Sequence, residues 1–298
     1  MKRRGVAASR RRGLASRLGV AVAAALFAVA ATARAELAPR ILGGAPAPDV
    51  AAAVALRDGA GRLACSGVLV GPRAVLAAAH CFPPVDDASL LPRDACFGAD
   101  VRSCRPVGVS GYVLHPGWDA LAFTFDDDLA VVFLEDDAPA RPASLAEASP
   151  SAGDEIDVVG YGRTDPSSTR SAGEKRSVRL PVLAIERGRI LHGEGACRGD
   201  SGGPLFDARR PASVVAITSS GPAGCVDAGR ATLVAPNRAF IDAAVAESEV
   251  SAAGGPSCAL ARGSRGDGSL VAVVLAALLA WRLRGAHPSG GRASRRLP

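Results

Sequence analysis

Between Ile41 and about Val234 the sequence consists of short apolar runs that Gly, Pro or Asp interrupt every ten or so residues. The runs are rich in Val, Ile and Leu, as in DLAVVFLED, EIDVVGYGR and SVVAITSSG. Runs of this length and composition are typical of β-strands. The 34 Gly and 21 Pro of the 298-residue chain fit a turn-rich protein better than a helical bundle. The pattern therefore predicts an all-β barrel or sandwich.

A helix is expected to close this domain over residues 237–248, where apolar residues recur at helical spacing. The Gly/Ser/Ala-rich segment SAAGGPSCALARGSRGDGS follows it and has the composition of a linker. We therefore expect the folded part to end near residue 249, followed by a linker over 250–268 and a tail over 269–298.

The N-terminal segment has the pattern of an export signal. Basic residues precede an apolar run from Leu18 to Ala31, and small residues stand at Ala33 and Ala35, the two positions that a signal peptidase reads. The run is shorter than the roughly 20 residues that a transmembrane helix needs. We therefore expect a signal peptide over 1–35. The arginines of SRRRGL leave open whether export is general or follows the twin-arginine route.

The net charge of +6 does not indicate a nucleic-acid surface, because it is concentrated at the ends of the chain. Seven basic residues fall within the first seventeen positions and five arginines within the last seventeen. The middle of the chain is close to neutral, so we expect no nucleic-acid partner. Only two of the 35 basic residues are lysines, which favours a GC-rich bacterial genome.

Export makes disulfide bonds available to the seven cysteines, of which six can pair. None has metal-ligand spacing, because His80 beside Cys81 is the one such adjacency and no CxxC motif accompanies it. We therefore expect no metal, no other cofactor and one cysteine left over. The cysteines are Cys65, Cys81, Cys96, Cys104, Cys197, Cys225 and Cys258.

Residues 197–204 read CRGDSGGP and hold Ser201 between glycines. Alone, such a run is a common Gly-rich turn. A serine hydroxyl becomes a nucleophile beside a base that a third group orients. The candidate base is His80, at the end of an apolar run, although a buried structural histidine is the commoner role. The other histidines lie in the basic tail, in a turn before proline and in an Arg/Gly-rich loop; they are His287, His115 and His192.

The candidate orienting carboxylate is Asp128, the last of three consecutive aspartates that lead into LAVVFL. Three aspartates in a row more often form a solvated turn. A carboxylate at the start of an apolar strand is costly, however, unless it is hydrogen-bonded. The pattern thus favours a buried and hydrogen-bonded Asp128.

Three motifs in this order resemble the trypsin/chymotrypsin-like family of serine endopeptidases: AAHC around His80, DDLAVV around Asp128 and GDSGGP around Ser201. The resemblance covers residues 41 to about 245, roughly two thirds of the chain. It implies an all-β fold of two perpendicular six-stranded antiparallel β-barrels with a C-terminal helix and the site in the cleft between the barrels.

Each barrel would supply part of the site. The first barrel, over about 41–145, would carry the histidine and the aspartate, and the second, over about 146–249, the serine. In the implied mechanism His80 takes the proton of Ser201 as the serine attacks a peptide carbonyl, and Asp128 fixes the imidazole tautomer.

Further site residues follow from the same resemblance. The backbone amides of Gly199 and Ser201 would form the oxyanion hole, with glycines that let the substrate carbonyl approach bare backbone. Ser219 matches the family residue that hydrogen-bonds the catalytic aspartate.

The segment RILGG resembles the family's activation sequence. Cleavage after Arg40 would free the amine of Ile41 to pair with Asp200, the acidic residue beside the serine. With a signal peptide cut after Ala35, the propeptide is residues 36–40.

The resemblance also implies two disulfides, one stapling the histidine loop and one holding the walls of the specificity pocket. A third pair has no confident match in the family and is assigned only because these two cysteines remain. The pairs are, in this order, Cys65–Cys81, Cys197–Cys225 and Cys96–Cys104.

The specificity pocket departs from the trypsin type. Six residues before the serine, trypsin-type enzymes carry an Asp that binds substrate Arg or Lys, and this chain has Gly195. Gly221 and Gly229 would be unhindered pocket walls, so with Ser219 they predict a pocket that is open and uncharged at its base. We predict a preference for a bulky apolar or aromatic substrate residue on the acyl side of the cleaved bond. The alternative is that nearby Asp227 restores some preference for substrate Arg or Lys. A protease other than this one would then cleave after the propeptide.

The leftover Cys258 precedes an apolar stretch over 270–281 and terminal arginines. Together they resemble the C-terminal sorting tails of the MYXO-CTERM type, which are cut near the cysteine. An ordinary tail anchor with an idle thiol is the alternative. We expect the protein at the cell surface or outer membrane, or released, with tail-processing and export machinery as partners.

We expect a monomeric peptidase that acts on protein or peptide substrates, and two other functions are its rivals. RGD tripeptides at 198–200 and 265–267 would fit an adhesion protein, but abundant residue types generate them easily. A proteolytically inactive homologue that serves as a surface binding module is the second rival.

Overall fold

The structure is a computed structural model in which residues 44–84, 88–121, 125–222 and 224–252 are described. The predicted signal peptide, the activation residues Arg40 and Ile41, and the linker and tail with Cys258 lie outside the described residues.

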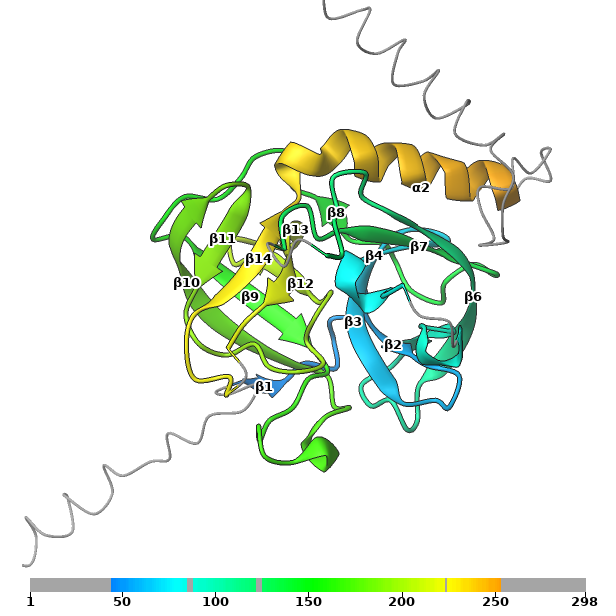
Figure 1. Cartoon of the computed structure of the whole chain (residues 1–298), viewed down its shortest axis with the longest axis horizontal. Helices are drawn as coiled ribbons and strands as arrows, with labels where there is room; N and C mark the ends of the chain where they lie inside the picture. The colour runs from blue at the N-terminus through cyan, green and yellow to red at the C-terminus, as the bar shows by residue number, and fades with distance from the viewer. Residues whose placement is uncertain (1–43, 85–87, 122–124, 223, 253–298) are drawn as a thin grey trace, which may run out of the picture. The chain divides into compact units, whose positions relative to one another are not determined.

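Six antiparallel strands close into the first barrel (Figure 1). Hydrogen-bonded neighbours follow the order β2-β3-β4-β7-β6-β5, and β5 pairs back to β2. The Ala-, Val- and Leu-rich β4 and β7 are buried along almost their whole length. The strands are β2 Ala53–Arg57, β3 Leu63–Gly71, β4 Ala74–Ala77, β5 Asp94–Phe97, β6 Arg105–Leu114 and β7 Ala130–Leu134.

The second barrel also has six antiparallel strands, which close in the order β9-β10-β11-β14-β13-β12 and back to β9. Two short strands attach to it: β1 pairs with β10, and β8 runs parallel to β13. Two closed six-stranded barrels confirm the predicted fold class. The strands are β1 Ala45–Pro46, β8 Ser144–Leu145, β9 Glu155–Gly160, β10 Arg176–Glu186, β11 Arg189–His192, β12 Pro204–Asp207, β13 Arg210–Ser220 and β14 Gly229–Leu233.

One α-helix, α2, spans Arg238–Ala252 and follows the last strand. It extends past the predicted end at residue 248 because neither Gly nor Pro occurs before Gly254. Its residues Ile241 and Ala244 belong to the same buried cluster as the strands of the first barrel. No helix among the described residues is long and apolar enough to cross a membrane. Four 3₁₀ turns complete the described elements: η1 Ala79–Cys81, η2 Ala88–Leu90, η3 Thr169–Ser171 and η4 Ala235–Asn237.

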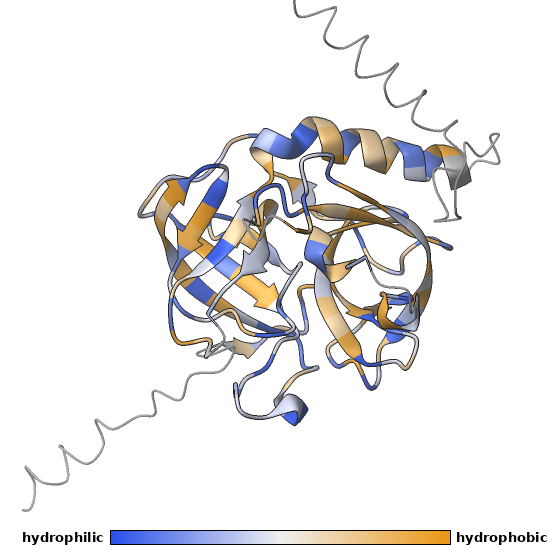
Figure 2. Ribbon diagram, viewed as in Figure 1, coloured by the Kyte–Doolittle hydropathy of each residue, from blue (hydrophilic) through white to orange (hydrophobic). Residues whose placement is uncertain are grey.

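Tyr161, at the end of β9, joins the two barrels. Its side chain is fully buried, and its hydroxyl lies 2.6 Å from the carbonyl oxygen of Gly98 and 3.1 Å from that of Ala53, both in the first barrel. Figure 2 shows apolar residues along the strands of both barrels and polar residues in most connecting turns. The barrels are therefore held together both by apolar packing and by directed polar contacts near their junction.

Candidate active site

His80 and Asp128 stand next to two strands that are hydrogen-bonded neighbours in the first barrel. The 3₁₀ turn η1 follows β4 and carries His80, while Asp128 stands two residues before β7, the strand paired with β4. The His80 ring nitrogen Nδ1 lies 2.7 Å from Asp128 Oδ2, and the backbone N–H of His80 donates to Asp128 Oδ1 at 2.9 Å. Two separate bonds thus fix the imidazole relative to the carboxylate.

Asp128 is fully buried, and the second barrel supplies its third hydrogen bond. The hydroxyl of Ser219, in β13, donates to Asp128 Oδ2 at 2.6 Å. An ionised carboxylate only accepts hydrogen bonds, so Nδ1 of His80 carries the proton and Nε2 is left as an acceptor. The predicted burial and bonding of Asp128 are found, and a buried carboxylate with three donors is well compensated.

Ser201 lies on the loop between β11 and β12, which packs tightly on the first barrel. The backbone carbonyl of Ser201 accepts from the N–H of Ser66 at 2.8 Å, and the Ser66 hydroxyl donates to the carbonyl of Gly199 at 2.8 Å. Gly202 has φ +81°, and a Cβ there would collide with the Ser66 carbonyl. The glycine is therefore needed for the loop to approach β3, a role that the sequence reasoning missed.

Two backbone amides on this loop are free to donate. Within the described part of the chain, neither the N–H of Gly199 nor that of Ser201 has a hydrogen-bond partner. These are the two amides that the sequence places in an oxyanion hole. Unpaired donors next to a nucleophile can stabilise charge that develops on a carbonyl oxygen.

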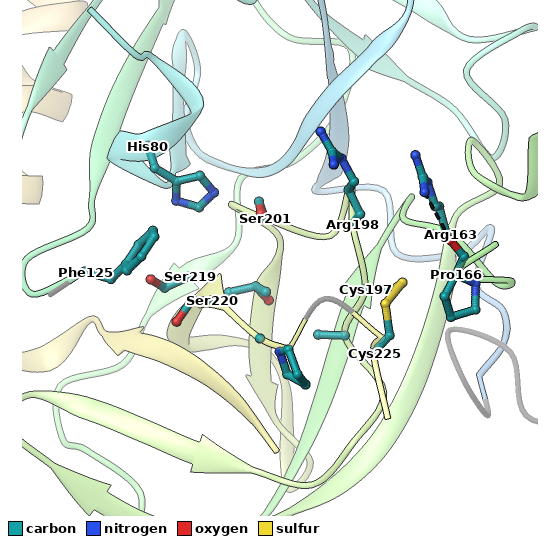
Figure 3. A pocket seen from close by; sticks show the side chains of 14 residues that line it. His80, Phe125, Arg163, Pro166, Cys197, Arg198, Ser201, Ser219, Ser220 and Cys225 are labelled. Atoms are coloured by element: carbon teal, nitrogen blue, oxygen red, sulfur yellow. Dashed lines mark hydrogen bonds between the residues drawn. A yellow bond between two sulfur atoms is a disulfide. The ribbon is translucent and has the colours of Figure 1, made fainter. Parts of the chain in front are cut away.

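A cavity of about 350 Å³ adjoins these groups. Figure 3 shows the His80 ring and the Ser201 side chain at one end of it, with Phe125 beside the histidine. The rings of His80 and Phe125 meet edge to face, with 5.7 Å between their centroids. No hydrogen bond joins the His80 ring to the Ser201 hydroxyl among the described residues; such bonds often tighten only when substrate is present.

Asp200, beside the serine, is completely buried. Its carboxylate accepts from the backbone N–H of Gly162 and of Cys197, each at 2.8 Å. No cation among the described residues forms an ion pair with it. Burial raises the pKa of Asp200 to about 6, and the two backbone hydrogen bonds offset only part of this effect.

The predicted pocket residues separate into two pairs. Ser219 and Gly221 line the cavity, whereas Gly195 and Gly229 are buried and are not among its lining residues. The expectation of an unhindered Gly229 is wrong, because the ring of His192 fills the space that a side chain there would take. Asp227 is exposed and does not line the cavity.

His192 itself was misplaced by the sequence reasoning. It lies in β11 rather than in a loop, and it is fully buried. The strand β11 follows β10 after the two-residue turn Arg187–Gly188 and pairs on its other edge with β14, which is distant in sequence. Other cavity residues that the sequence did not indicate are Phe125, Arg163, Arg198 and Thr218.

Three disulfides join the six cysteines of the described residues, and they are the pairs given above. Cys197–Cys225 lies on the cavity wall (Figure 3). Cys65, His80 and Cys81 have potential metal-ligand atoms within 4.8 Å of one another. Both sulfurs of this group are consumed by their disulfide, so it cannot act as a thiolate metal site.

The first RGD tripeptide is unsuited to adhesion. It spans 198–200 on the loop at the cavity, and its aspartate is completely buried. The second, over 265–267, lies outside the described residues.

Comparison with known proteins gives a consistent result. The family model described as Trypsin matches residues 41–243. Serine protease 56 of Mus musculus is 32% identical over 218 residues, which cover 64% of this chain and 36% of that protein. Serine protease 56 of Homo sapiens is 30% identical over 247 residues, which cover 74% of this chain and 40% of that protein. The chain thus spans 36–40% of the length of these two curated relatives.

Among solved structures, neuropsin, a serine protease expressed in the limbic system of mouse brain, is similar in fold. Its TM-score is 0.59 at 24% sequence identity, over 68% of this chain and 98% of that chain. This similarity extends through both barrels.

Proposed function

Since the chain belongs to the trypsin family, we propose that it is a secreted serine endopeptidase that hydrolyses peptide bonds through an acyl-enzyme. It would be made as a zymogen and activated by cleavage after Arg40. The observation that carries this proposal is the Asp128 carboxylate, which binds His80 twice and Ser219 once and leaves one imidazole nitrogen free toward the cavity.

The proposed reaction follows from that tautomer. Nε2 of His80 accepts the proton of Ser201 while the serine oxygen forms a bond to the peptide carbonyl carbon. The imidazolium then gives this proton to the leaving amine as the peptide bond breaks. Water, deprotonated in turn by His80, hydrolyses the ester and restores the serine.

Charge that develops on the carbonyl oxygen is stabilised by the amides of Gly199 and Ser201. Their freedom from other partners supports this role. Loss of one such donor typically costs about 3 to 4 kcal/mol of transition-state stabilisation.

The zymogen proposal rests on Asp200. A fully buried carboxylate whose described partners are two backbone amides is suited to receive a cation. The amine of Ile41 after cleavage would supply this charge. Its arrival would fix the loop that carries the two oxyanion donors.

Export and surface retention are part of the same proposal. Three disulfides support an oxidising compartment. The signal peptide over 1–35 and the sorting tail with Cys258 lie outside the described residues, and intact mass of the mature protein would test both cleavages.

An inactive homologue that binds proteins at the surface is the alternative function. The intact arrangement around Asp128 favours the enzyme, because nothing in a binding module requires a buried carboxylate that orients an imidazole.

Covalent labelling tests the proposal. Residues 36–40 are replaced by the enteropeptidase recognition sequence, so that cleavage exposes Ile41 as the first residue. The purified chain is treated with a fluorophosphonate before and after cleavage, and the added mass is measured. Ser201→Ala is the control for the nucleophile, and Asp200→Asn the control for the switch.

The outcomes separate the two parts of the proposal. Labelling of the cleaved chain alone, abolished in both variants, supports the nucleophile and the switch. Equal labelling before and after cleavage refutes the switch and retains the nucleophile. Absence of labelling in both forms refutes the enzyme and favours the binding module.

A further inference from the structure

Two arginines line the cavity beside Ser201, and they come from segments that pack against each other. The backbone N–H of Arg163 donates to the carbonyl of Arg198 at 3.0 Å. A Cβ on Gly199 would lie 3.0 Å from the Cα of Gly162. Both arginines are among the residues that line the cavity together with Ser201. Two positive charges are therefore carried by adjoining stretches of one cavity wall.

The two arginine side chains are within reach of a bound peptide. Arg198 is exposed and Arg163 is half-buried. Figure 3 shows both side chains running in the same direction, with their guanidinium ends directed away from the Cys197–Cys225 disulfide. Nη1 of Arg163 donates to the carbonyl of Pro166 at 3.2 Å, whereas the guanidinium of Arg198 has no hydrogen-bond partner in the described part of the chain. Donors of both side chains are thus available at the rim of the cavity.

No negative charge at the cavity offsets these two positive charges. None of the described residues that line it is an Asp or a Glu. No ion pair within the described ranges includes Arg163 or Arg198. The carboxylates close to them in sequence do not line the cavity; they belong to Asp165, Glu194 and Asp200. A cleft lined by charges of one sign concentrates a potential of that sign.

Chain length limits how far from the nucleophile these charges lie. Arg198 stands three residues before Ser201, so their Cα atoms are at most about 11 Å apart. An extended substrate advances about 3.3 to 3.6 Å per residue, so about three of its residues span that distance. A peptide whose scissile carbonyl lies at Ser201 therefore passes the arginines within about three residues of the cleaved bond.

We propose that Arg163 and Arg198 are specificity-determining residues that select substrates with an Asp or Glu near the cleaved bond, within the reach just given. This inference rests on the proposed endopeptidase function and assigns its substrate class, acidic peptides. The substrate carboxylate accepts charge-assisted hydrogen bonds from the guanidinium groups. At the rim it keeps part of its hydration, so this pairing avoids most of the desolvation cost of a buried ion pair. A substrate Lys or Arg at the same place is repelled.

The test uses the cleaved full chain and a series of peptides with Phe fixed directly before the cleaved bond. Each other position within the reach of the arginines carries Glu, Gln or Lys in turn. At one position or more, kcat/KM for Glu should exceed that for its neutral isostere Gln about three- to tenfold, as expected for exposed charge pairs. Lys should be cleaved least there. Equal rates for Glu and Gln at every position would overturn the proposal.

Variants at the two arginines locate the preference. The Glu to Gln ratio should fall in Arg198→Gln and in Arg163→Gln, and it should approach one when both are replaced. Arg198→Glu should reverse the order, so that Lys peptides are cleaved faster than Glu peptides. A ratio that persists in the double variant overturns the assignment.

The matched control is Arg170→Gln. Arg170 is exposed and lies in η3, on the same loop between β9 and β10 as Arg163, but it does not line the cavity. The substitution removes the same charge from the same face of the loop sequence. Its Glu to Gln ratio should equal that of the unsubstituted chain, and a fall as large as in Arg198→Gln would mean that net charge, not the cavity rim, selects the substrate.

Ionic strength supplies an independent check on the charge pairing. The Debye length falls from about 10 Å at 0.1 M salt to about 3 Å at 1 M. The Glu to Gln ratio of the unsubstituted chain should therefore fall toward one at the higher salt concentration. A preference for Glu that salt does not change would contradict recognition by the exposed guanidinium groups.

Fluorophosphonate labelling separates this proposal from the function on which it rests. Labelling of Ser201 in the cleaved unsubstituted chain, together with equal rates for Glu and Gln peptides, would refute the acidic preference and leave the endopeptidase standing. Absence of labelling in that chain would refute the endopeptidase first, and the substrate class with it.

Discussion

The two barrels share a strand count and a topology but differ in what they bury. In the first barrel the buried polar residues are few: Asp58, Ser66 and Asp128. Between β9 and the end of β14 the second barrel buries many more: Lys175, Arg176, His192, Asp200, Asp207, Ser213, Thr218, Ser219 and Thr232. Burial of polar groups opposes folding unless they are paired, so the second barrel carries most of that cost.

The difference matches the separate roles of the two barrels in the proposed enzyme. The first barrel holds the base and its carboxylate with every bond complete in the uncleaved chain. The second barrel holds Asp200, whose carboxylate has two backbone amides and no cation as its described partners. Catalytic geometry is thus set by folding, whereas the proposed activation requires the new chain end at Ile41.

The largest effect on kcat should come from changing Asp128, whose carboxylate accepts hydrogen bonds from residues of both barrels. Asp128→Asn presents an amide N–H₂ to His80 Nδ1 and favours the wrong tautomer, so kcat of the cleaved enzyme should fall about 10⁴-fold. Ser219→Ala removes one hydrogen bond to the same carboxylate and should reduce kcat about 10- to 100-fold. The measurement is kcat on a peptide substrate, with Tm as a check on folding. An equal loss in both variants would show that the first barrel does not orient the base by itself.

Disulfide removal should affect stability similarly in both barrels but activity in only one. Replacing Cys65 and Cys81, or Cys197 and Cys225, with alanine opens loops of 16 and 28 residues. In the chain-entropy model each costs about 3 to 4 kcal/mol of the free energy of unfolding. The pair on the cavity wall should also lower kcat/KM, which peptide hydrolysis and urea unfolding measure together.

The third disulfide is the control for that comparison. Cys96–Cys104 closes a loop of 8 residues, away from the cavity. Its removal should cost about 2 to 3 kcal/mol and leave kcat/KM unchanged. A drop in kcat/KM as large as that for the wall disulfide would mean that activity follows global stability rather than the pocket.

Asp200 should make the stability of the uncleaved chain depend on pH. Its pKa is raised to about 6 when folded, against 3.8 ordinarily, so the folded chain binds a proton that the unfolded chain releases. The stabilising contribution is therefore complete below about pH 4 and is lost as the pH rises through 6. The shift corresponds to at most about 3 kcal/mol.

Urea unfolding at pH 4 to 7 checks this expectation, with Asp200→Asn as the variant that cannot titrate. The uncleaved parent should lose stability relative to the variant as the pH rises. In the cleaved chain the Ile41 amine should diminish or reverse that difference. If the free energy of unfolding varied with pH in parallel for the uncleaved parent and the variant, the raised pKa would be contradicted.

Sequence reasoning found the parts of the site that depend on local motifs. His80, Asp128 and Ser201 each lie in a short run whose neighbours indicate their environment. The punctuated apolar runs predicted an all-β barrel or sandwich, and the family resemblance implied the two six-stranded barrels. The structure brings the histidine and the aspartate into contact and places the serine on the same cavity.

What the sequence did not reveal depends on register between distant strands. Gly229 is blocked only because β11 and β14 pair His192 opposite it. The Ser66 hydroxyl reaches a loop 133 residues away. Neither contact can be read from a local pattern, because each joins segments that are far apart in the sequence.

The smallest expected effect is at the junction of the barrels. Tyr161→Phe deletes the hydroxyl that lies on the carbonyls of Gly98 and Ala53, and leaves two buried acceptors with one donor fewer. The free energy of unfolding should fall by about 1 to 2 kcal/mol. Because Lys175 contacts the ring and not the hydroxyl, at 5.6 Å from the ring centroid, that interaction should persist. Tyr112→Phe, a half-exposed tyrosine stacked on Phe82 within the first barrel, is the control and should change stability by less than about 0.5 kcal/mol. If Tyr161→Phe also lowered kcat, the polar contacts between the barrels would position the catalytic groups as well as hold the halves together.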